Sequence, residues 1–260
     1  MCLAGLINAL KIAEKDISAV KVVLNGAGAA GIACVRLMCS YGVRKENVIM
    51  CDTKGVIFKG RTEGMSAQKE EFANDTPKRT LAEALEGADV FVGVSAAGAL
   101  KPEYLVSMGP MPIIFAMANP EPEIRPSVAK QVRADAIVAT GRSDYPNQIN
   151  NVMCFPFLFR GTLDTRSRII NEDMKMAAAL ALSELARLPV PEEVLRAYEG
   201  RQFTFGPDYI IPTPFDPRLI FVVSEAVAKA AIKSGVAQNV IEDWVDYQCQ
   251  LRARTTKPNL

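Results

Sequence analysis

The first half of the chain alternates short apolar runs with amphipathic segments. Residues 20–25 form an apolar run rich in β-branched side chains, and similar runs recur at 47–52, 88–95, 111–119 and 135–140. Such runs are typical of strands that are buried on both faces of a sheet. Helical spacing at 32–42 and a short segment at 80–86 predict connecting helices. The pattern therefore predicts an α/β fold with a Rossmann-type, doubly wound, mostly parallel sheet.

The second half of the chain changes to a helical pattern from Ile170 onward. Apolar stripes and helix-boundary residues predict helices at 171–187, 191–199 and 217–234, with a further amphipathic segment at 240–252. We therefore expect a Rossmann core over about 16–165 and additional C-terminal helices over about 166–260.

The first residues also predict a helix. Residues 3–14 have helical spacing of apolar side chains, and no Ser, Thr, Asp or Asn precedes them as a cap. A natural start would rarely lack a cap in this way. We expect the chain to be a fragment that begins inside a helix, with an upstream domain missing.

Composition narrows the possible classes of function. Apolar residues make up 49% of the 260, and 30 basic residues against 29 acidic ones give a net charge of +1. A net charge this small creates no overall electrostatic attraction for nucleic acid or anionic lipid, so we expect neither nucleic-acid nor membrane partners. The six cysteines form no C-x-x-C pair, which predicts reduced thiols in a cytoplasmic protein. The chain has no histidine, which excludes imidazole chemistry within it.

A glycine turn, Gly26-Ala27-Gly28-Ala29-Ala30-Gly31, follows the first predicted strand and opens a predicted helix. Gly26 permits a tight turn, Gly28 lets the backbone approach a pyrophosphate, and Gly31 lets the helix pack close to the strand. The exposed amides and the helix dipole, at Ala29, Ala30 and their neighbours, favour phosphate. In this strand–turn–helix context the motif predicts a dinucleotide site.

Asp52-Thr53-Lys54 ends the next predicted strand, where the adenosine ribose would lie. Asp52 alone favours NAD, because a carboxylate accepts from the 2′-hydroxyl and repels a 2′-phosphate. Thr53 and Lys54 favour NADP, because they offer a hydroxyl and a cation. Lys59 and Arg61 could add charge there. The alternative is that Lys54, Lys59 and Arg61 are solvated surface. We expect NADP, with NAD as the alternative.

Three further segments end predicted strands, where ligands gather in parallel sheets. Ser95 and Ala96 begin a loop of residues with small side chains, so a cofactor can lie against its backbone. Asn119 ends the strand at 111–119, and its amide can bond a carboxamide or a substrate oxygen. Asn150 and Asn151 precede an apolar segment and can orient a small polar acid. For each Asn, a capping or turn role is the alternative.

The segments together resemble the cofactor-binding domain of malic enzymes, in particular the short bacterial type. The resemblance covers roughly residues 7–235, in the stretches INALKI, ISAVKVVLNGAGAAGIAC, MCDTKGVIFKGR, GVSAAGAL, IIFAMANPEPEI, NQINNVMCFPFLFRG and IIPTPFDPRLI. It implies an NAD(P)-binding domain over 1–260. It also implies that the intact enzyme oxidatively decarboxylates malate to pyruvate and CO2, using NADP or NAD and a divalent metal, Mg2+ or Mn2+.

The resemblance also implies roles for single residues. Residues 26–31 and Asp52 would contact the pyrophosphate and the ribose, and Lys54 follows a pattern similar to NADP-using members. Asn119 and Asn151 would touch the nicotinamide and malate, with Asn150 beside them.

The family's catalytic Tyr and Lys and its metal-binding Glu and Asp residues lie upstream of this chain. We therefore expect no catalytic and no metal-ligating residue in the fragment, and no activity from it alone. We expect a homo-oligomer.

Two other functions remain open at this point. One is a cofactor domain of another Rossmann dehydrogenase, such as an amino-acid dehydrogenase. The other is a non-catalytic dinucleotide-binding domain. Full-length bacterial relatives can also carry a phosphotransacetylase-like domain downstream.

Overall fold

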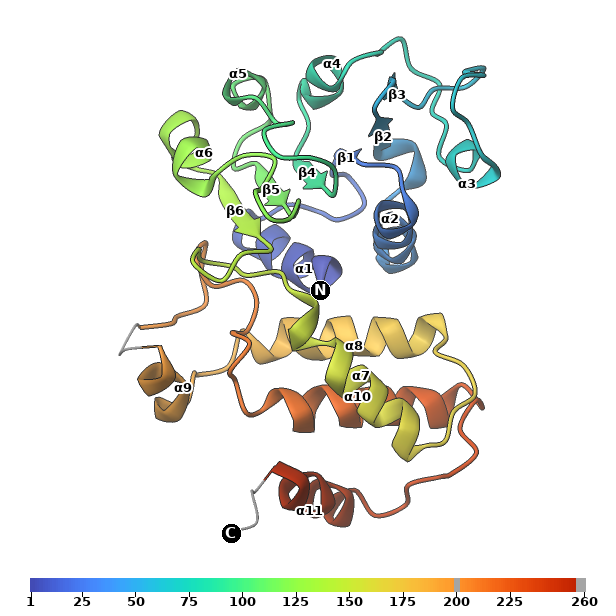
Figure 1. Ribbon diagram of the computed structural model, residues 1–260, viewed down its shortest axis with the longest axis vertical. Helices are drawn as coiled ribbons and strands as arrows, with labels where there is room; N and C mark the ends of the chain where they lie inside the picture. Colours follow the sequence, from blue (N-terminus) through green and yellow to red (C-terminus); the bar gives the residue numbers. More distant parts are fainter. Residues whose placement is uncertain (199–201, 256–260) are drawn as a thin grey trace. The chain divides into compact units, whose positions relative to one another are not determined.

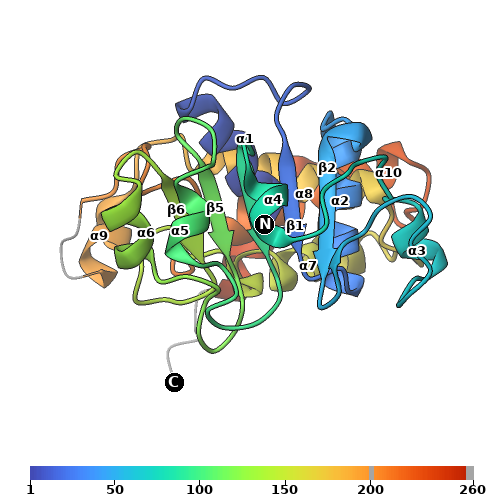
Figure 2. The same ribbon diagram turned by 90° about the horizontal axis from the view of Figure 1, so that it is seen from above.

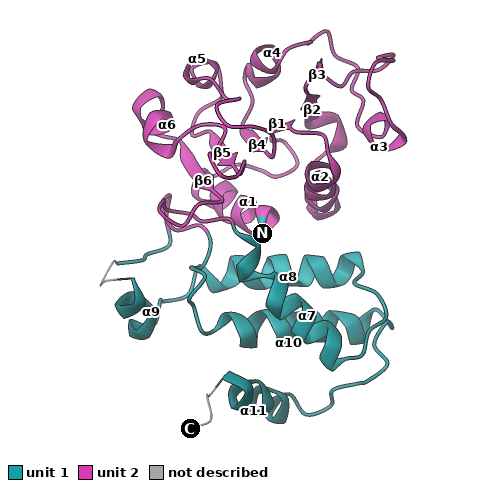
Figure 3. Cartoon of the chain, in the orientation of Figure 1, with its two compact units in different colours: residues 1, 150–205, 211–260 teal, residues 2–149, 206–210 magenta. Residues whose placement is uncertain are grey.

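The computed structural model describes residues 1–198 and 202–255 of the chain (Figure 1). The chain divides into two compact units (Figure 3). One comprises residues 2–149 and 206–210 and is called the sheet unit below. The other comprises residue 1, 150–205 and 211–260 and is called the helical unit. The sequence predicted a Rossmann core that ends at about residue 165, whereas the sheet unit ends at residue 149 before it resumes at 206–210. The extent of the functional domain stays a prediction.

The sheet unit contains a six-stranded sheet in the order β3-β2-β1-β4-β5-β6 (Figure 1). Figure 2 shows β6, β5, β1 and β2 from left to right. The strands are β1 (Val22–Asn25), β2 (Val48–Asp52), β3 (Gly55–Val56), β4 (Val90–Gly93), β5 (Ile113–Ala116) and β6 (Ile137–Thr140). All pairs are parallel except β2 with β3. The strand order reverses between β1 and β4, and in open α/β sheets ligands bind at such a switch point. The predicted sheet is confirmed; the short antiparallel β3 was not predicted.

Helices cover both faces of this sheet. Phe91 and Ile114 on one face pack in a buried cluster with residues of α4 (Leu81–Leu85), α5 (Pro102–Leu105) and α6 (Pro126–Val132). On the other face lie α1 (Cys2–Ile12) and α2 (Ala29–Tyr41). A side chain at Gly5 of α1 would meet the Phe115 ring at 3.3 Å, so α1 packs closely on β5. A 3-10 turn (Lys45–Asn47) and α3 (Ala67–Glu70) complete the unit.

Local residue choices place two of these helices. Helix α2 ends at Gly42, whose φ of 137° lets its amide return to the carbonyls of Met38 and Cys39. Helix α4 begins with a capping box, in which Thr80 and Glu83 each bond the other's backbone amide. Both ends were predicted closely, because their signals lie within a few residues of the boundary.

The segment 206–210 belongs to the sheet unit although it is distant in sequence. The buried Asn147 side chain donates to the carbonyls of Val138 (2.9 Å) and Pro207 (2.7 Å) and accepts from the amide of Ile210 (2.9 Å). Asn8 of α1 donates to the Ile210 carbonyl at 2.8 Å. These bonds satisfy backbone groups that would otherwise be buried without partners.

The helical unit comprises a 3-10 turn (Asn151–Met153), α7 (Phe155–Asp164), α8 (Glu172–Leu185), α9 (Glu192–Ala197), α10 (Leu219–Lys233) and α11 (Trp244–Thr255). Helix α10 packs against both α7 and α8. The helices at α8, α9, α10 and α11 were predicted with shifted ends; residue 199, the predicted end of α9, lies outside the described residues. Helix α7 was not predicted, although a proline in its first turn is a typical start signal.

The crossing of α7 over α10 depends on Gly161. A Cβ there would lie 2.5 Å from the Ser224 carbonyl oxygen and 2.9 Å from Val227 Cβ, so α10 would have to move. At a solvent-exposed position inside a helix, replacing glycine by alanine raises the free energy of unfolding by about 1 kcal/mol. At Gly161 the added methyl group would instead overpack the helix contact and lower the free energy of unfolding.

We therefore expect Gly161→Ala to lower the free energy of unfolding of the helical unit by about 1–3 kcal/mol. Urea unfolding followed by circular dichroism measures this. Gly141→Ala serves as the control, because its Cβ would meet nothing closer than 3.8 Å. An unchanged or more stable Gly161→Ala chain would show that the two helices do not cross at this distance.

Candidate dinucleotide-binding site

The glycine turn joins β1 to α2 at the switch point of the sheet. Gly26 has a φ of 112°, and a Cβ there would lie 2.5 Å from the Val94 carbonyl oxygen. A Cβ at Gly31 would lie 2.3 Å from the Gly26 carbonyl oxygen. At Gly28 a Cβ would meet nothing within 4 Å. The chain's own packing thus requires Gly26 and Gly31, whereas the space at Gly28 is open to a ligand.

The start of α2 offers unbonded donors beside that space. Gly28 is the N-cap and provides no side-chain bond, and the first turn contains no acidic residue. Ala29 and Ala30 are exposed. A cavity of about 400 Å³ opens here, lined by Ala27, Gly28, Ala29, Ile32, Ala33, Arg36, Ser66 and Gln68. The helix dipole and free amides favour an anion at this position.

Asp52 lies at the end of β2 inside a cluster of cations. Its carboxylate accepts two bonds from Arg61 (2.8 and 2.9 Å) and one from Lys69 (2.7 Å), and it also accepts from the Lys54 amide (2.9 Å). Burial works to raise the pKa of Asp52, but the bonds from Lys69, the Lys54 amide and Arg61 together hold that pKa below its ordinary value. The carboxylate is therefore ionised and already neutralised by two cations.

The cations around Asp52 are not arranged as the sequence suggested. The Lys54 ammonium pairs with Glu63 at 2.6 Å, and both side chains are largely exposed. Arg61, for which solvated surface was one alternative, is 8% exposed and also donates to the carbonyls of Gly55 and Val56. The sequence analysis did not identify Lys69 as part of this cluster. It lies 17 residues from Asp52 in the chain, so no local sequence pattern connects the two.

Ser95 and Ala96 follow β4 and are exposed. Ser95 Oγ accepts from the Asn25 side-chain amide at 3.0 Å. The Ser95 amide and hydroxyl both donate to Glu123 Oε1, at 2.8 and 3.0 Å. The loop is therefore tied to β1 on one side and to Glu123 on the other.

Glu123 is a completely buried carboxylate that sequence reasoning missed. Its second oxygen accepts from the Ala118 amide at 3.0 Å, so the side chain joins the loops after β4 and β5. A Cβ on Gly93 would lie 2.4 Å from its Cδ, so β4 must end in glycine. The local sequence PEPEIRP, residues 120–126, does not distinguish Glu123 from the neighbouring Glu121, whose side chain is 41% exposed.

The three predicted amides belong to different units. Asn119 lies at the carboxyl end of β5 in the sheet unit and is exposed, with a cis peptide bond to Pro120. Asn150 and Asn151 belong to the helical unit. Asn150 caps the 3-10 turn by accepting from the Val152 amide at 3.1 Å, and Asn151 is exposed. The capping role raised as an alternative is thus present at Asn150.

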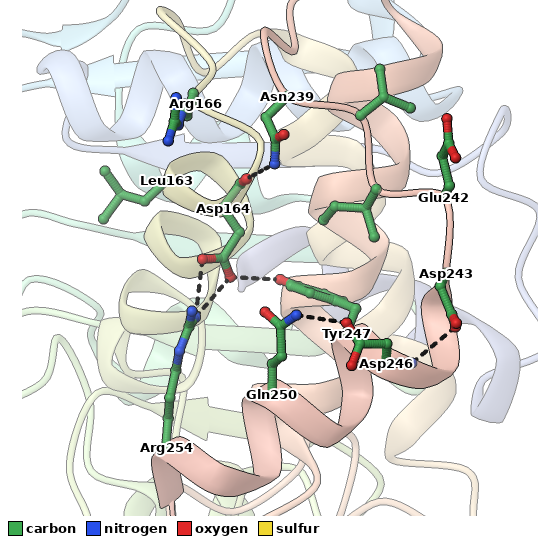
Figure 4. Close-up of a pocket in the computed structure, with 12 residues that line it drawn as sticks. Leu163, Asp164, Arg166, Asn239, Glu242, Asp243, Asp246, Tyr247, Gln250 and Arg254 are labelled. Atoms are coloured by element: carbon green, nitrogen blue, oxygen red, sulfur yellow. Dashed lines mark hydrogen bonds and ion pairs between the residues drawn. The ribbon is translucent and has the colours of Figure 1, made fainter.

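A second cavity, of about 460 Å³, lies in the helical unit (Figure 4). Asp164 there is bonded by Tyr247 (2.9 Å) and Arg254 (3.0 Å), and burial and the Asp164 charge raise the Tyr247 pKa above its ordinary value. Other lining carboxylates are Glu242, Asp243 and Asp246. These charges disfavour a pyrophosphate, so this cavity is not the dinucleotide site.

No three Cys, Asp or Glu side chains within residues 1–198 and 202–255 lie close enough together to hold a metal ion. In the same ranges, every helix is too short or too polar to cross a membrane.

Comparisons with known proteins give the family. Residues 1–195 match the family model described as malic enzyme, NAD binding domain. The chain is 59% identical over 251 residues to an NADP-dependent malic enzyme of Rhizobium meliloti, covering 96% of this chain and 33% of that protein. It is 51% identical over 244 residues to an NAD-dependent malic enzyme of the same organism, covering 94% and 32%.

Solved structures agree with this result. The crystal structure of Entamoeba histolytica malic enzyme superposes with a TM-score of 0.83 at 36% identity, covering 96% of this chain and 50% of that one. The chain spans about a third of the length of the curated relatives named above. The predicted fold and the predicted family are both confirmed. The chain belongs to the malic enzyme family.

Proposed function

We propose that this chain binds NADP, and NAD more weakly, at the switch point between β1 and β4. We further propose that it is the dinucleotide-binding part of an enzyme that oxidatively decarboxylates malate to pyruvate and CO2. The observation that carries the proposal is Gly28. It leaves open space at the uncapped start of a 13-residue helix, at the edge where parallel-sheet proteins bind nucleotides.

Each predicted contact has a place in this proposal. The amides of residues 28–31 would bind the pyrophosphate, and the exposed Ser95, Ala96 and Asn119 would flank the nicotinamide half. Glu123 supports this half by holding the loops after β4 and β5 together. Asn150 and Asn151 are proposed malate contacts in the whole protein.

The preference for NADP is supported by the charges around Asp52. A 2′-phosphate carries nearly two negative charges, which an unpaired carboxylate would repel. Asp52 is paired with Arg61 and Lys69, so the cluster carries net positive charge. Lys54 can add a third cation, because exposed pairs such as Lys54–Glu63 contribute only ~0–1 kcal/mol and are easily exchanged. Relatives named for either cofactor exist.

In the whole protein, this chain would bind the dinucleotide, and residues outside it would supply the acid–base and metal chemistry. The bound dinucleotide would supply the acceptor for the hydride that leaves malate C2. This chain's part is to bind it, to fix the nicotinamide at the β4 and β5 edge and to exclude it from solvent. We propose that the whole protein is a cytoplasmic homo-oligomer without nucleic-acid or membrane partners.

The turn is tested by Gly28→Val. Gly28 has φ of −90° and ψ of −175°, which valine adopts, and a Cβ there would meet no protein atom within 4 Å, so the chain should fold normally. The branched side chain would occupy the space of the pyrophosphate. We expect NADP and NAD affinity, measured by calorimetry, to fall at least tenfold. Ala134→Val, at an exposed position before the amino end of β6, should leave both affinities unchanged. Unchanged affinity in Gly28→Val would place the ligand elsewhere.

The cofactor preference is tested by removing single charges with Lys69→Met and Lys54→Met. Each charge-assisted bond to a 2′-phosphate is worth about 1.5–3 kcal/mol. We therefore expect each variant to bind NADP about tenfold to a hundredfold more weakly and NAD nearly as before. Lys59→Met, an exposed neighbour, is the control. Tighter binding of NAD than NADP by the parent chain contradicts the preference, and an equal loss for both cofactors contradicts the assignment of that lysine.

A further inference from the structure

Three sulfur atoms meet on the face of the sheet that α1 and α2 cover. Cys2 Sγ, at the start of α1, lies 3.7 Å from Cys34 Sγ in the second turn of α2. It lies 3.3 Å from the sulfur of Met117, the residue after β5. At 3.7 Å the two thiol sulfurs touch, so no atom separates them. Bond formation needs a closure of about 1.7 Å, since a disulfide measures ~2.05 Å.

The two thiols differ in acidity and exposure. The contact with Cys2 lowers the pKa of Cys34 to about 7, although burial opposes this. The same contact, together with burial, raises the pKa of Cys2 well above its ordinary value. The first proton lost from the pair therefore leaves a thiolate on Cys34, the partly exposed member. A thiolate is the reactive form of cysteine.

Three other cysteines lack these properties. Burial raises the pKa of Cys51 to about 12, and it also raises the pKa of Cys39 and of Cys154. Cys39 lies on the same helix as Cys34, so it provides a matched comparison within α2. Oxidation should therefore select the Cys2–Cys34 pair over these three thiols.

We propose that Cys2 and Cys34 form an oxidisable pair, and that their disulfide weakens dinucleotide binding at the neighbouring turn. The oxidant is a peroxide. The Cys34 thiolate attacks hydrogen peroxide, which breaks the O–O bond and gives a sulfenic acid and hydroxide. Cys2 sulfur then displaces the sulfenic hydroxyl, and its proton leaves with it as water. Overall, two thiols and one peroxide give one disulfide and two waters. A dithiol reductant reverses the change.

The coupling follows from what α2 and Met117 support. Helix α2 begins at the proposed phosphate site, and it packs so closely on the glycine turn that a Cβ at Gly31 would lie 2.3 Å from the Gly26 carbonyl oxygen. Closing the 3.7 Å gap between the sulfurs displaces Cys34 on this tightly packed helix and Cys2 beside Met117. Met117 directly precedes Ala118 and Asn119 at the nicotinamide edge. The disulfide therefore disturbs both halves of the site. This coupling rests on the proposed function; the disulfide itself does not.

The test oxidises the purified chain with hydrogen peroxide, alkylates remaining thiols and maps disulfides by mass spectrometry. NADP affinity is measured before oxidation, after it and after dithiothreitol. We expect a Cys2–Cys34 disulfide and about tenfold weaker, fully restorable binding. By linkage, saturating NADP should then raise the pair's midpoint potential by about 30 mV. Cys39→Ser should behave like the parent chain. Cys34→Ser and Cys2→Ala should keep their reduced-state affinity after peroxide.

The outcomes separate the two proposals. Absence of the Cys2–Cys34 disulfide, or its formation with unchanged affinity, overturns the inference. The same loss of affinity in Cys34→Ser and in Cys2→Ala would also overturn it, because another modification would then be responsible. Failure of the reduced chain to bind either dinucleotide would refute the proposed function and the coupling together, while the mass spectrum still decides whether the disulfide forms.

Discussion

Helix α2 starts directly beneath the end of β1 because residues 26 and 31 carry no side chains. A single methyl group at Gly31 would fall 2.3 Å from the Gly26 carbonyl oxygen, and one at Gly26 would fall 2.5 Å from the carbonyl of Val94. This close approach aims the free amides of the helix at the carboxyl ends of β1 and β4, where the strand order reverses. Once α2 is held there, the open space at Gly28 and the strand ends that carry Asp52, Ser95 and Asn119 share one edge of the sheet.

Two carboxylates at that edge of the sheet differ in their partners: Asp52 is paired with cations, and Glu123 accepts hydrogen bonds from two loops. Asp52 is surrounded by Arg61 and Lys69, so the end of β2 is electropositive. Glu123 accepts from Ser95 and Ala118, and among the described residues no Lys or Arg forms an ion pair with it. The polarity agrees with an oxidised dinucleotide, whose phosphates are anionic and whose nicotinamide ring is cationic. The proposed NADP preference depends on Asp52 and its cations. The conformation of the loops after β4 and β5 depends on Glu123.

The parts of the site that sequence predicted are those with local signals. A strand, a glycine turn and a helix are adjacent in the chain, and the Gly42 that ends α2 follows that helix directly. The missed residues act across distance: Glu123 reaches Ser95 from 28 residues away, and Lys69 reaches Asp52 from 17. The pairing of Lys54 with Glu63 could not be foreseen either, because flexible exposed side chains have several partners within reach.

The central claim is that a dinucleotide binds along the carboxyl edge of the sheet. Amide chemical shifts of the 15N-labelled chain, followed by NMR during titration with NADP, test it most directly. The account predicts that the largest changes occur at residues 27–31, at 52–54 and 69, and at 95–97. Changes confined to the helical unit, or no saturable change at millimolar NADP, would contradict it.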